Sequence, residues 1–486
     1  MRHSIAFGVL ASLLALASSS AAQDAGGDAH PLFPAPPEVT RLPSGLRIIS
    51  IPWPSPGIVA YYTLVRVGSR DEVEAGHSGF AHLFEHMMFR GTEAMSGDEY
   101  ERRIQALGAD NNAYTTRDFT MYTVTAPAEE LASVVNLEAE RFQRLSFSEE
   151  DYRTETGAVQ GEYAKSASSP SLPMWEALSG LAFREHTYGH TTLGALRDIC
   201  AMPDEVAYAR RFFSRFYTPD NTTILVAGDV EHGALVREVR RAYGRWRGRR
   251  ARVNVPAEST VRSGSEHLVW NGSAPPRMHL GYRTPAFAGG ARSAAARRAA
   301  LRETAALDVA RSLVLSEASP LVQRLVTQER TLLQLVGYAQ PTRDPGLFVV
   351  SATFPPPAET PAAAARDAAF DAVQDAVQAA FDGLARGDVD AARFQRTRSH
   401  LRYALIADVS TPSDAADLLG RMIAVGGESD DLTRYLAALD AVTAEDVARV
   451  AGAYLVPARR VRVTLAPPSP GESAPERREP LCPEAE

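Results

Sequence analysis

Residues 76–92, GHSGFAHLFEHMMFRGT, contain the pattern that decides the fold, with HLFEH at its centre. In a helix, His82 and His86 lie one turn apart on the same face, where two imidazoles can bind one zinc ion. Glu85 projects close to that face, where it can take a proton from a water that the metal activates. This HxxEH order is the inverse of the commoner HExxH. The alternative is a buried helix that happens to carry two histidines.

A catalytic zinc also needs a third protein ligand from another element. Residues 148–165, SEEDYRTETGAVQGEYAK, are predicted to form a helix, and Glu162 in it is the candidate ligand. Glu155 precedes Glu162 by two helical turns, so both side chains point the same way. One can bind the metal while the other orients a ligand. The alternative is a solvated acidic helix face.

The composition of the 486-residue chain is that of a globular protein, with 45% hydrophobic and 23% charged residues. This length predicts two or more domains. The net charge of −8 argues against nucleic acid as the main partner and against a polybasic membrane surface. Beyond the N-terminal segment, the sequence contains no stretch apolar enough to cross a membrane.

The N-terminus resembles a secretory signal over residues 1–22, with a basic start, a short apolar core at 5–17 and small residues before Gln23. A membrane anchor is the alternative, but the apolar run is short for a span. Residues 23–36 are predicted to be a flexible lead-in. We therefore expect a periplasmic or secreted protein, in which Cys200 and Cys482 are permitted, but not required, to form a disulfide.

The remaining chain divides into residues 37–250, a linker at 251–260, residues 261–467 and a disordered tail at 468–486. Strands and helices mix without strict βαβ alternation, which predicts an α+β fold. Residues 41–52 and 58–67 are predicted to be paired strands, and the alternating residues 111–126 to be strand. The second part repeats the element order of the first loosely and lacks HxxEH.

Four stretches together carry a family resemblance. They are HLFEH with Glu162 following 76 positions after His86, FRGT at 89–92, NNAYTTRDFTMY at 111–122 and YTPDNTTILVAGD at 217–229. The sequence resembles the pitrilysin family, which includes insulin-degrading enzyme and the mitochondrial processing peptidase, over about residues 37–467. The resemblance implies a tandem duplication of two similar α+β halves. Each would be a mostly antiparallel sheet with helices packed on it, and only 37–250 would bind metal.

The resemblance also implies roles for particular residues. His82, His86 and Glu162 would hold one Zn²⁺ per chain, Glu85 would be the general base, and Glu155 would assist. Residues 112 and 113, Asn112-Ala113, would line the cleft on a sheet edge and bind the peptide substrate as an added strand. A purely structural strand is the alternative there.

The implied function is an exported zinc endopeptidase acting on peptides or small unfolded polypeptides. Two alternatives remain at this stage. One is a non-catalytic assembly or scaffold subunit on the same fold, and the other is a zinc hydrolase of another class, such as an amidase.

The second half departs from the family pattern at one place. Active relatives often carry an Arg and a Tyr, seven residues apart, that bind the substrate backbone. The best alignment puts Val326 and Leu333 there, and Arg324 and Tyr338 have the wrong spacing to replace them. We hypothesise that a zinc-free sister subunit supplies these groups, so that this chain would be the catalytic subunit of a dimer.

Overall fold

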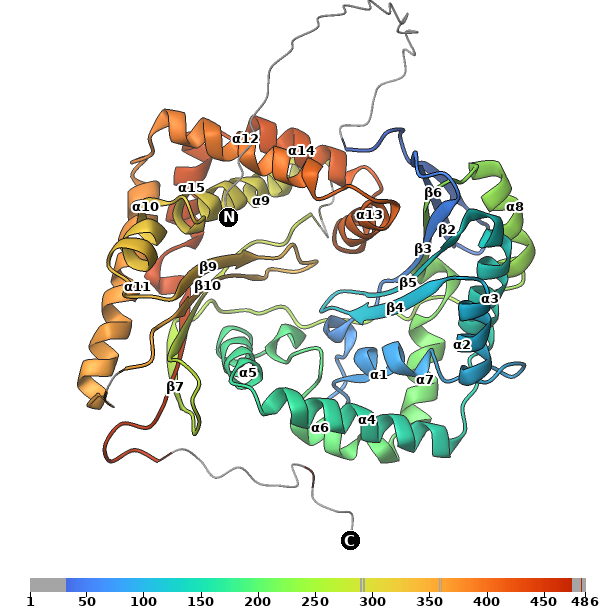
Figure 1. Cartoon of the computed structure of the whole chain (residues 1–486), viewed down its shortest axis with the longest axis horizontal. Coiled ribbons are helices and arrows are strands. Elements are labelled where there is room, and N and C mark those ends of the chain that lie inside the picture. The colour runs from blue at the N-terminus through green and yellow to red at the C-terminus, as the bar shows by residue number, and fades with distance from the viewer. Residues whose placement is uncertain are drawn as a thin grey trace, which may run out of the picture.

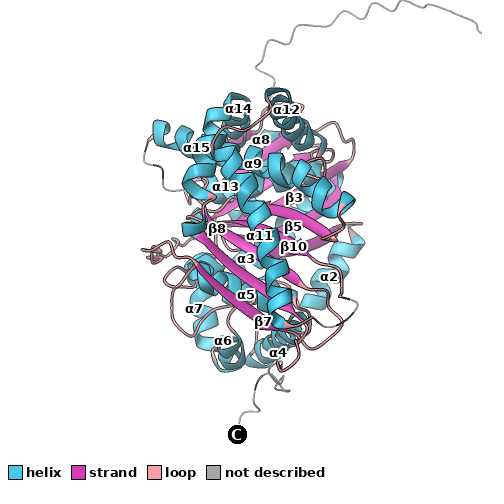
Figure 2. Cartoon of the chain, turned by 90° about the vertical axis from the view of Figure 1, so that its left-hand side faces the viewer, coloured by secondary structure: helices cyan, strands magenta, loops and turns pink. Residues whose placement is uncertain are grey.

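The computed structural model describes residues 32–288, 291, 293–357, 359, 361–473 and 482. Within them the chain forms two sheets, each with its own helices, that lie side by side in Figure 1. Figure 2 shows the strands in the middle of the molecule, with helices above and below them. The predicted α+β class is confirmed. The predicted signal (1–22) and most of the lead-in (23–36) lie outside the described residues.

The first half contains a six-stranded sheet and eight α-helices in its described residues. In chain order these are β1 (Glu38–Arg41), β2 (Arg47–Pro52), β3 (Ile58–Val65), α1 (Phe80–Met87), α2 (Gly97–Ala106), β4 (Asp110–Thr115), β5 (Thr120–Pro127), α3 (Leu131–Arg144), α4 (Glu149–Ala167), α5 (Ser171–Ala182), α6 (Leu196–Ala201), α7 (Val206–Phe216), β6 (Thr222–Gly228) and α8 (His232–Tyr243).

The strand order of this sheet is β1-β2-β6-β3-β5-β4, so two strand predictions need correction. Strands β2 and β3 do not pair with each other, because β6, from much later in the chain, lies between them. Residues 111–126 are two strands of a hairpin, β4 and β5, since the chain turns at residues 116–119. The hairpin places β4 at one end of the sheet, where one of its edges pairs with no strand among the described residues.

The second half contains a five-stranded sheet in the order β7-β11-β8-β10-β9. Its elements are β7 (Gly264–Val269), β8 (Arg277–Arg283), α9 (Ala294–Leu315), α10 (Pro320–Val322), a π-helix (Gln323–Gln328), β9 (Gln334–Ala339), β10 (Leu347–Thr353), α11 (Ala363–Ala385), α12 (Ala391–Ala407), α13 (Pro412–Gly426), α14 (Asp431–Ala441), α15 (Ala444–Tyr454) and β11 (Arg460–Ala466).

The two sheets share one topology, as the expected duplication requires. In each, the first long strand pairs in parallel with the last strand (β2 with β6, β7 with β11), and every other pairing is antiparallel. Strand β9 is therefore the counterpart of β4. Residues 251–260, predicted as the linker, contain no helix or strand.

Each half also covers part of the other's sheet with a helix. Helix α5 packs on β7, β8 and β11, where Leu178 joins the apolar cluster of Val461 and Val463. Helix α13 packs on β2, β3 and β6, and its Gly420 lies so close to Met121 that an added Cβ would come within 2.5 Å of the Met121 Cε. Separating the halves would expose these apolar faces to water, so the halves form one body.

Partly buried charges also link the halves. Asp344, in the loop before β10, accepts hydrogen bonds from Arg70 and from His186 Nε2 (3.0 Å), both in the first half. Arg343 bonds to Asp71 at 3.3 Å. Burial alone would raise the pKa of Asp344, but the bonds from His186 and Arg70 outweigh it and hold the pKa well below its ordinary value.

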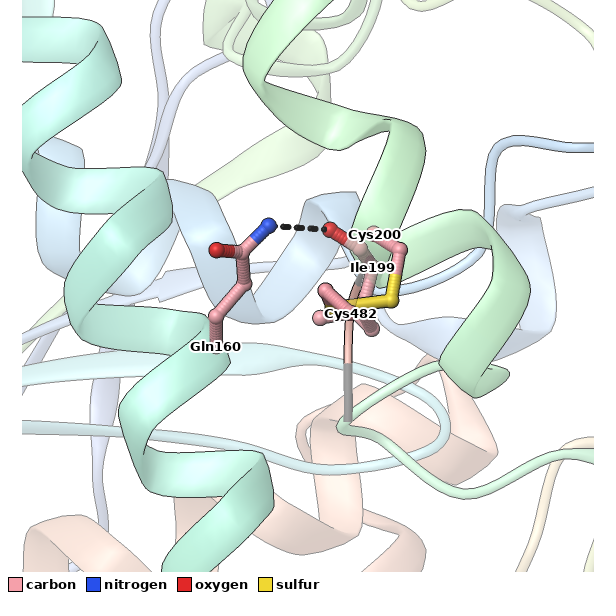
Figure 3. The surroundings of a disulfide bond; sticks show 4 residues. All are labelled: Gln160, Ile199, Cys200 and Cys482. Carbon is pink, nitrogen blue, oxygen red and sulfur yellow. Dashed lines mark hydrogen bonds between the residues drawn. A yellow bond between two sulfur atoms is a disulfide. The ribbon is translucent and has the colours of Figure 1, made fainter. Parts of the chain in front are cut away.

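The C-terminal segment returns to the first half. Cys482 forms a disulfide with Cys200 on α6, which settles the pairing that the sequence left open (Figure 3). The predicted disordered tail is wrong for residues 468–473, because Ser469 is buried and Glu472 pairs with Arg366. No helix of the described residues is both long and apolar enough to cross a bilayer.

Candidate metal centre

The HLFEH residues lie on α1, as the spacing predicts. The helix buries Phe80, Leu83, Phe84 and Met87, and Phe84 stacks on Phe212 of α7 with ring centroids 5.5 Å apart. This apolar anchoring turns the opposite face, with both histidines, toward α4. The rings of His82 and His86 have centroids 4.8 Å apart on that face.

Helix α4 brings the third predicted group to the same place. It begins at a capping box in which Ser148 and Asp151 bond each other's backbone N–H. Glu162 Oε2 lies 3.6 Å from His82 Nε2 and 3.5 Å from His86 Nε2. One ligating atom from each of the three residues can be chosen so that all lie within 4.8 Å of one another.

This donor set fits a zinc ion. Four-coordinate zinc with ligand bonds of 2.0–2.1 Å places its ligand atoms about 3.3 Å apart, close to the separations of Glu162 from the two imidazoles. Two imidazole nitrogens and one carboxylate oxygen are ligand types that zinc prefers. Burial lowers the pKa of His82, which favours the neutral ring that can bind a cation.

Glu155 lies one layer behind the ligands. Its Oε1 is 2.8 Å from His86 Nδ1, and its Oε2 accepts a hydrogen bond from Arg90. The hydrogen bond to Glu155 raises the pKa of His86. Burial alone would raise the pKa of Glu155, but the bonds from His86 and Arg90 outweigh it and keep the pKa below its usual value. An ionised Glu155 fixes the proton on His86 Nδ1 and leaves the Nε2 lone pair directed toward Glu162.

A cleft of about 550 Å³ opens beside these groups. Glu85, His86 and Glu155 line it, together with Arg90 and residues of α2, β4 and α4. Glu85 is half-buried at its wall, next in sequence to His86. A substrate in the cleft would therefore reach the carboxylate of Glu85 and the ring of His86 together.

The predicted substrate-binding residues lie on a strand beside the cleft. Asn112 and Ala113 belong to β4, the outer strand of the first sheet, and both line the cleft. The N–H of Ala113 donates to the Asn112 side-chain oxygen at 2.8 Å. A short rotation of Asn112 would free this N–H for an added peptide strand.

Arg90 contacts Glu155 in the site, and the sequence did not predict this. FRGT at 89–92 marks its segment, but its bond to Glu155 depends on how α4 crosses α1. Every residue lining the cleft comes from residues 85–155, so the described second half contributes none. Leu333 is 56% exposed on the surface, and Arg324 pairs with Glu329 there at 3.8 Å.

Comparisons with known proteins agree with this architecture. Residues 48–196 match the family model described as Insulinase (Peptidase family M16), and residues 206–401 match Peptidase M16 inactive domain. The zinc protease PqqE of Helicobacter pylori is 24% identical over 446 residues, 88% of this chain and 93% of that protein. An uncharacterized zinc protease of Streptomyces coelicolor, SCO5738, is 30% identical over 204 residues, 42% of this chain and 44% of that protein.

Solved structures show the same fold. A protease from Helicobacter pylori superposes with a TM-score of 0.78 at 24% identity, covering 89% of this chain and 99% of that one. A peptidase M16 inactive domain from Pseudomonas fluorescens gives a TM-score of 0.76 at 14% identity, covering 89% and 98%. The resemblance seen in the sequence is thereby confirmed, and the chain belongs to peptidase family M16, the insulinase family.

Proposed function

We propose that this chain is an exported zinc endopeptidase that hydrolyses peptides or small unfolded polypeptides. The observation that carries the proposal is the convergence of His82, His86 and Glu162, at the side of an open cleft that Glu85 and His86 line. Relatives named zinc proteases, one of them matched over most of its length, support the same chemistry.

The residues divide the work as follows. His82, His86 and Glu162 would hold a zinc ion, which would supply a Lewis acid able to lower the pKa of water and polarise a scissile carbonyl. Glu85 takes the proton from the attacking water on its carboxylate and delivers it to the leaving nitrogen. Glu155 keeps the His86 proton on Nδ1, and so keeps Nε2 free to bind.

The outer strand β4 gives the substrate its orientation. A peptide added to the free edge at Asn112-Ala113 would lie extended along the cleft, with its backbone held by main-chain hydrogen bonds. In this binding mode the protein recognises the substrate's backbone more than its side chains, which suits unfolded segments. It also argues for a peptidase over an amidase that acts on small molecules.

Export is part of the proposal. The sequence of residues 1–22 favours a secretory signal, and the Cys200–Cys482 disulfide suits an oxidising compartment such as the periplasm.

The chain is further proposed to be the catalytic subunit of a dimer. The supporting observation is that all lining residues of the cleft belong to 85–155, while Arg324, Leu333 and Tyr338 lie at the surface of the second half. A zinc-free sister subunit would supply the Arg and Tyr that bind the substrate backbone. Full activity of the purified chain as a monomer or homodimer would refute this part.

The test of function is a peptide-cleavage assay with and without a chelator, on the chain alone and with its co-purified partner. A zinc peptidase gives cleavage that the chelator abolishes and that added Zn²⁺ restores. A scaffold subunit gives no cleavage in either state, even with the partner present and zinc bound.

A further inference from the structure

The N-terminus of α1 lacks a side-chain cap of its own. Its N-cap residue is Gly79, at φ 91°, a left-handed conformation that favours glycine. A Cβ at this position would come within 2.7 Å of Ile199 Cδ1 and of the Leu193 carbonyl oxygen. A Ser, Thr or Asp cap therefore does not fit here, and the first N–H groups of α1 need an acceptor from elsewhere.

Glu72 supplies that acceptor from the loop before the helix. Its Oε2 accepts from Gly79 N at 2.8 Å and its Oε1 from Ala81 N at 2.7 Å. The residue is only 4% exposed. Its carboxyl group meets the positive end of the helix dipole. Burial raises the pKa of Glu72 to about 8, against the opposing effect of these two backbone bonds.

The two histidines differ in how their rings are held. His86 Nδ1 is fixed by Glu155. His82 is 8% exposed, and its Nδ1 has no hydrogen-bond partner among the described residues. The orientation of His82 therefore depends on where the backbone of the first turn of α1 lies. Ala81, the residue directly before His82, is the one that Glu72 holds.

We propose that Glu72 is a positioning residue for the metal centre, which sets the place of His82 by capping α1 with its two carboxylate oxygens. The inference rests on the proposed metal site. Glu72 is not one of the three candidate ligands and bonds to the backbone of α1, so it acts through the helix. Asp198 supports Ser78, the residue before the N-cap Gly79, in a similar way. It accepts hydrogen bonds from Ser78 N at 3.2 Å and from Ser78 Oγ at 2.6 Å.

The test compares two buried carboxylates of the full-length chain. Glu72→Gln keeps the shape but turns an amide N–H₂ toward a backbone N–H. Asp431→Asn is the matched control, because Asp431 is also fully buried, accepts a loop N–H from Glu428 at 3.1 Å and pairs with Arg297, but lies in the second half. Zinc affinity is measured by competition with a chromophoric chelator, alongside Tm and the visible spectrum of the Co²⁺-loaded chain.

We expect Glu72→Gln to weaken zinc binding about 10-fold or more and to alter the Co²⁺ spectrum, as loss of a group supporting a ligand does. Asp431→Asn should lower Tm, leave the zinc affinity within twofold of the wild type and leave the Co²⁺ spectrum unchanged. Glu72→Asp, which keeps the carboxyl group on a shorter arm, should fall between.

Three results would overturn the proposal. One is folded Glu72→Gln that binds zinc as tightly as the wild type. Another is an equal loss of affinity in Asp431→Asn. The third is failure of both Glu72 variants to fold, since Glu72 would then serve the whole first half. A wild-type chain that binds no zinc would instead refute the proposed function. Glu162→Gln in the same assay separates failure of the Glu72 proposal from failure of the proposed metal site.

Discussion

Glu155→Gln probes the layer behind the metal ligands. The wild-type carboxylate accepts from His86 Nδ1 at 2.8 Å and from Arg90. A glutamine keeps one acceptor oxygen, so one of these two donors must face an N–H₂ group. One hydrogen bond to a charged group contributes about 1.5–3 kcal/mol, and each 1.4 kcal/mol is a factor of ten. We expect kcat/KM to fall about 10- to 100-fold.

Zinc content should change much less than rate, because the three ligating side chains stay in place. The assay is kcat/KM on a peptide, with zinc stoichiometry measured on the same preparation. Asp308→Asn is the control, since Asp308 accepts from Tyr435 at 2.6 Å in the second half and lies far in sequence from the site. Unchanged kcat/KM, or loss of zinc as complete as in a ligand variant, would refute the reasoning.

Three further changes test other parts of the account. Glu85→Gln should bind zinc normally and lose about 10²- to 10⁴-fold in rate, as loss of a general base does; hydrolysis near the wild-type rate would exclude that role. Ala113→Pro removes the backbone N–H of residue 113, and with it a hydrogen bond to the substrate that contributes about 1 kcal/mol, so KM should rise about 5-fold at similar kcat. An unchanged KM would show that β4 does not bind the substrate. Asp344→Asn should lower Tm at neutral pH, because the ionised carboxylate holds Arg70 and His186. The pKa of Asp344 is depressed in the folded chain, so this stabilisation is present above the ordinary pKa of about 4 and fades as pH falls. The difference in Tm between the wild type and Asp344→Asn should therefore narrow in acid. A difference that stays constant with pH would show that ionisation is not the cause.

Local spacing was sufficient to predict much of the candidate site. A spacing of four positions from His82 to His86 places both on one face of a helix, and a spacing of seven positions from Glu155 to Glu162 does the same on α4. The structure brings all four together, yet at different depths: Glu162 faces both Nε2 atoms, whereas Glu155 faces His86 Nδ1. The spacing alone does not distinguish these two positions, because both satisfy the helical period.

Contacts between distant segments could not be predicted in this way. Strand β6 enters between β2 and β3, and no period in the sequence records that pairing. The turn at 116–119 interrupts an alternating stretch without Gly or Pro, so the hairpin was missed. Strands β7 and β9 and helices α12–α15 were not predicted either. Helix α13, for example, packs on β2, β3 and β6 of the other half, a contact that no local pattern records. Glu72 and Arg90 are ordinary charged residues in sequence, and only the fold gives them partners.

The central claim is that two helices place three side chains around one zinc ion. The most direct measurement is the zinc content of purified wild type and Glu162→Gln after equilibration at limiting free Zn²⁺. We predict about one zinc per wild-type chain and a large loss in the variant, because only His82 and His86 would remain as ligands. Full zinc occupancy in Glu162→Gln, at the wild-type affinity, would contradict the account.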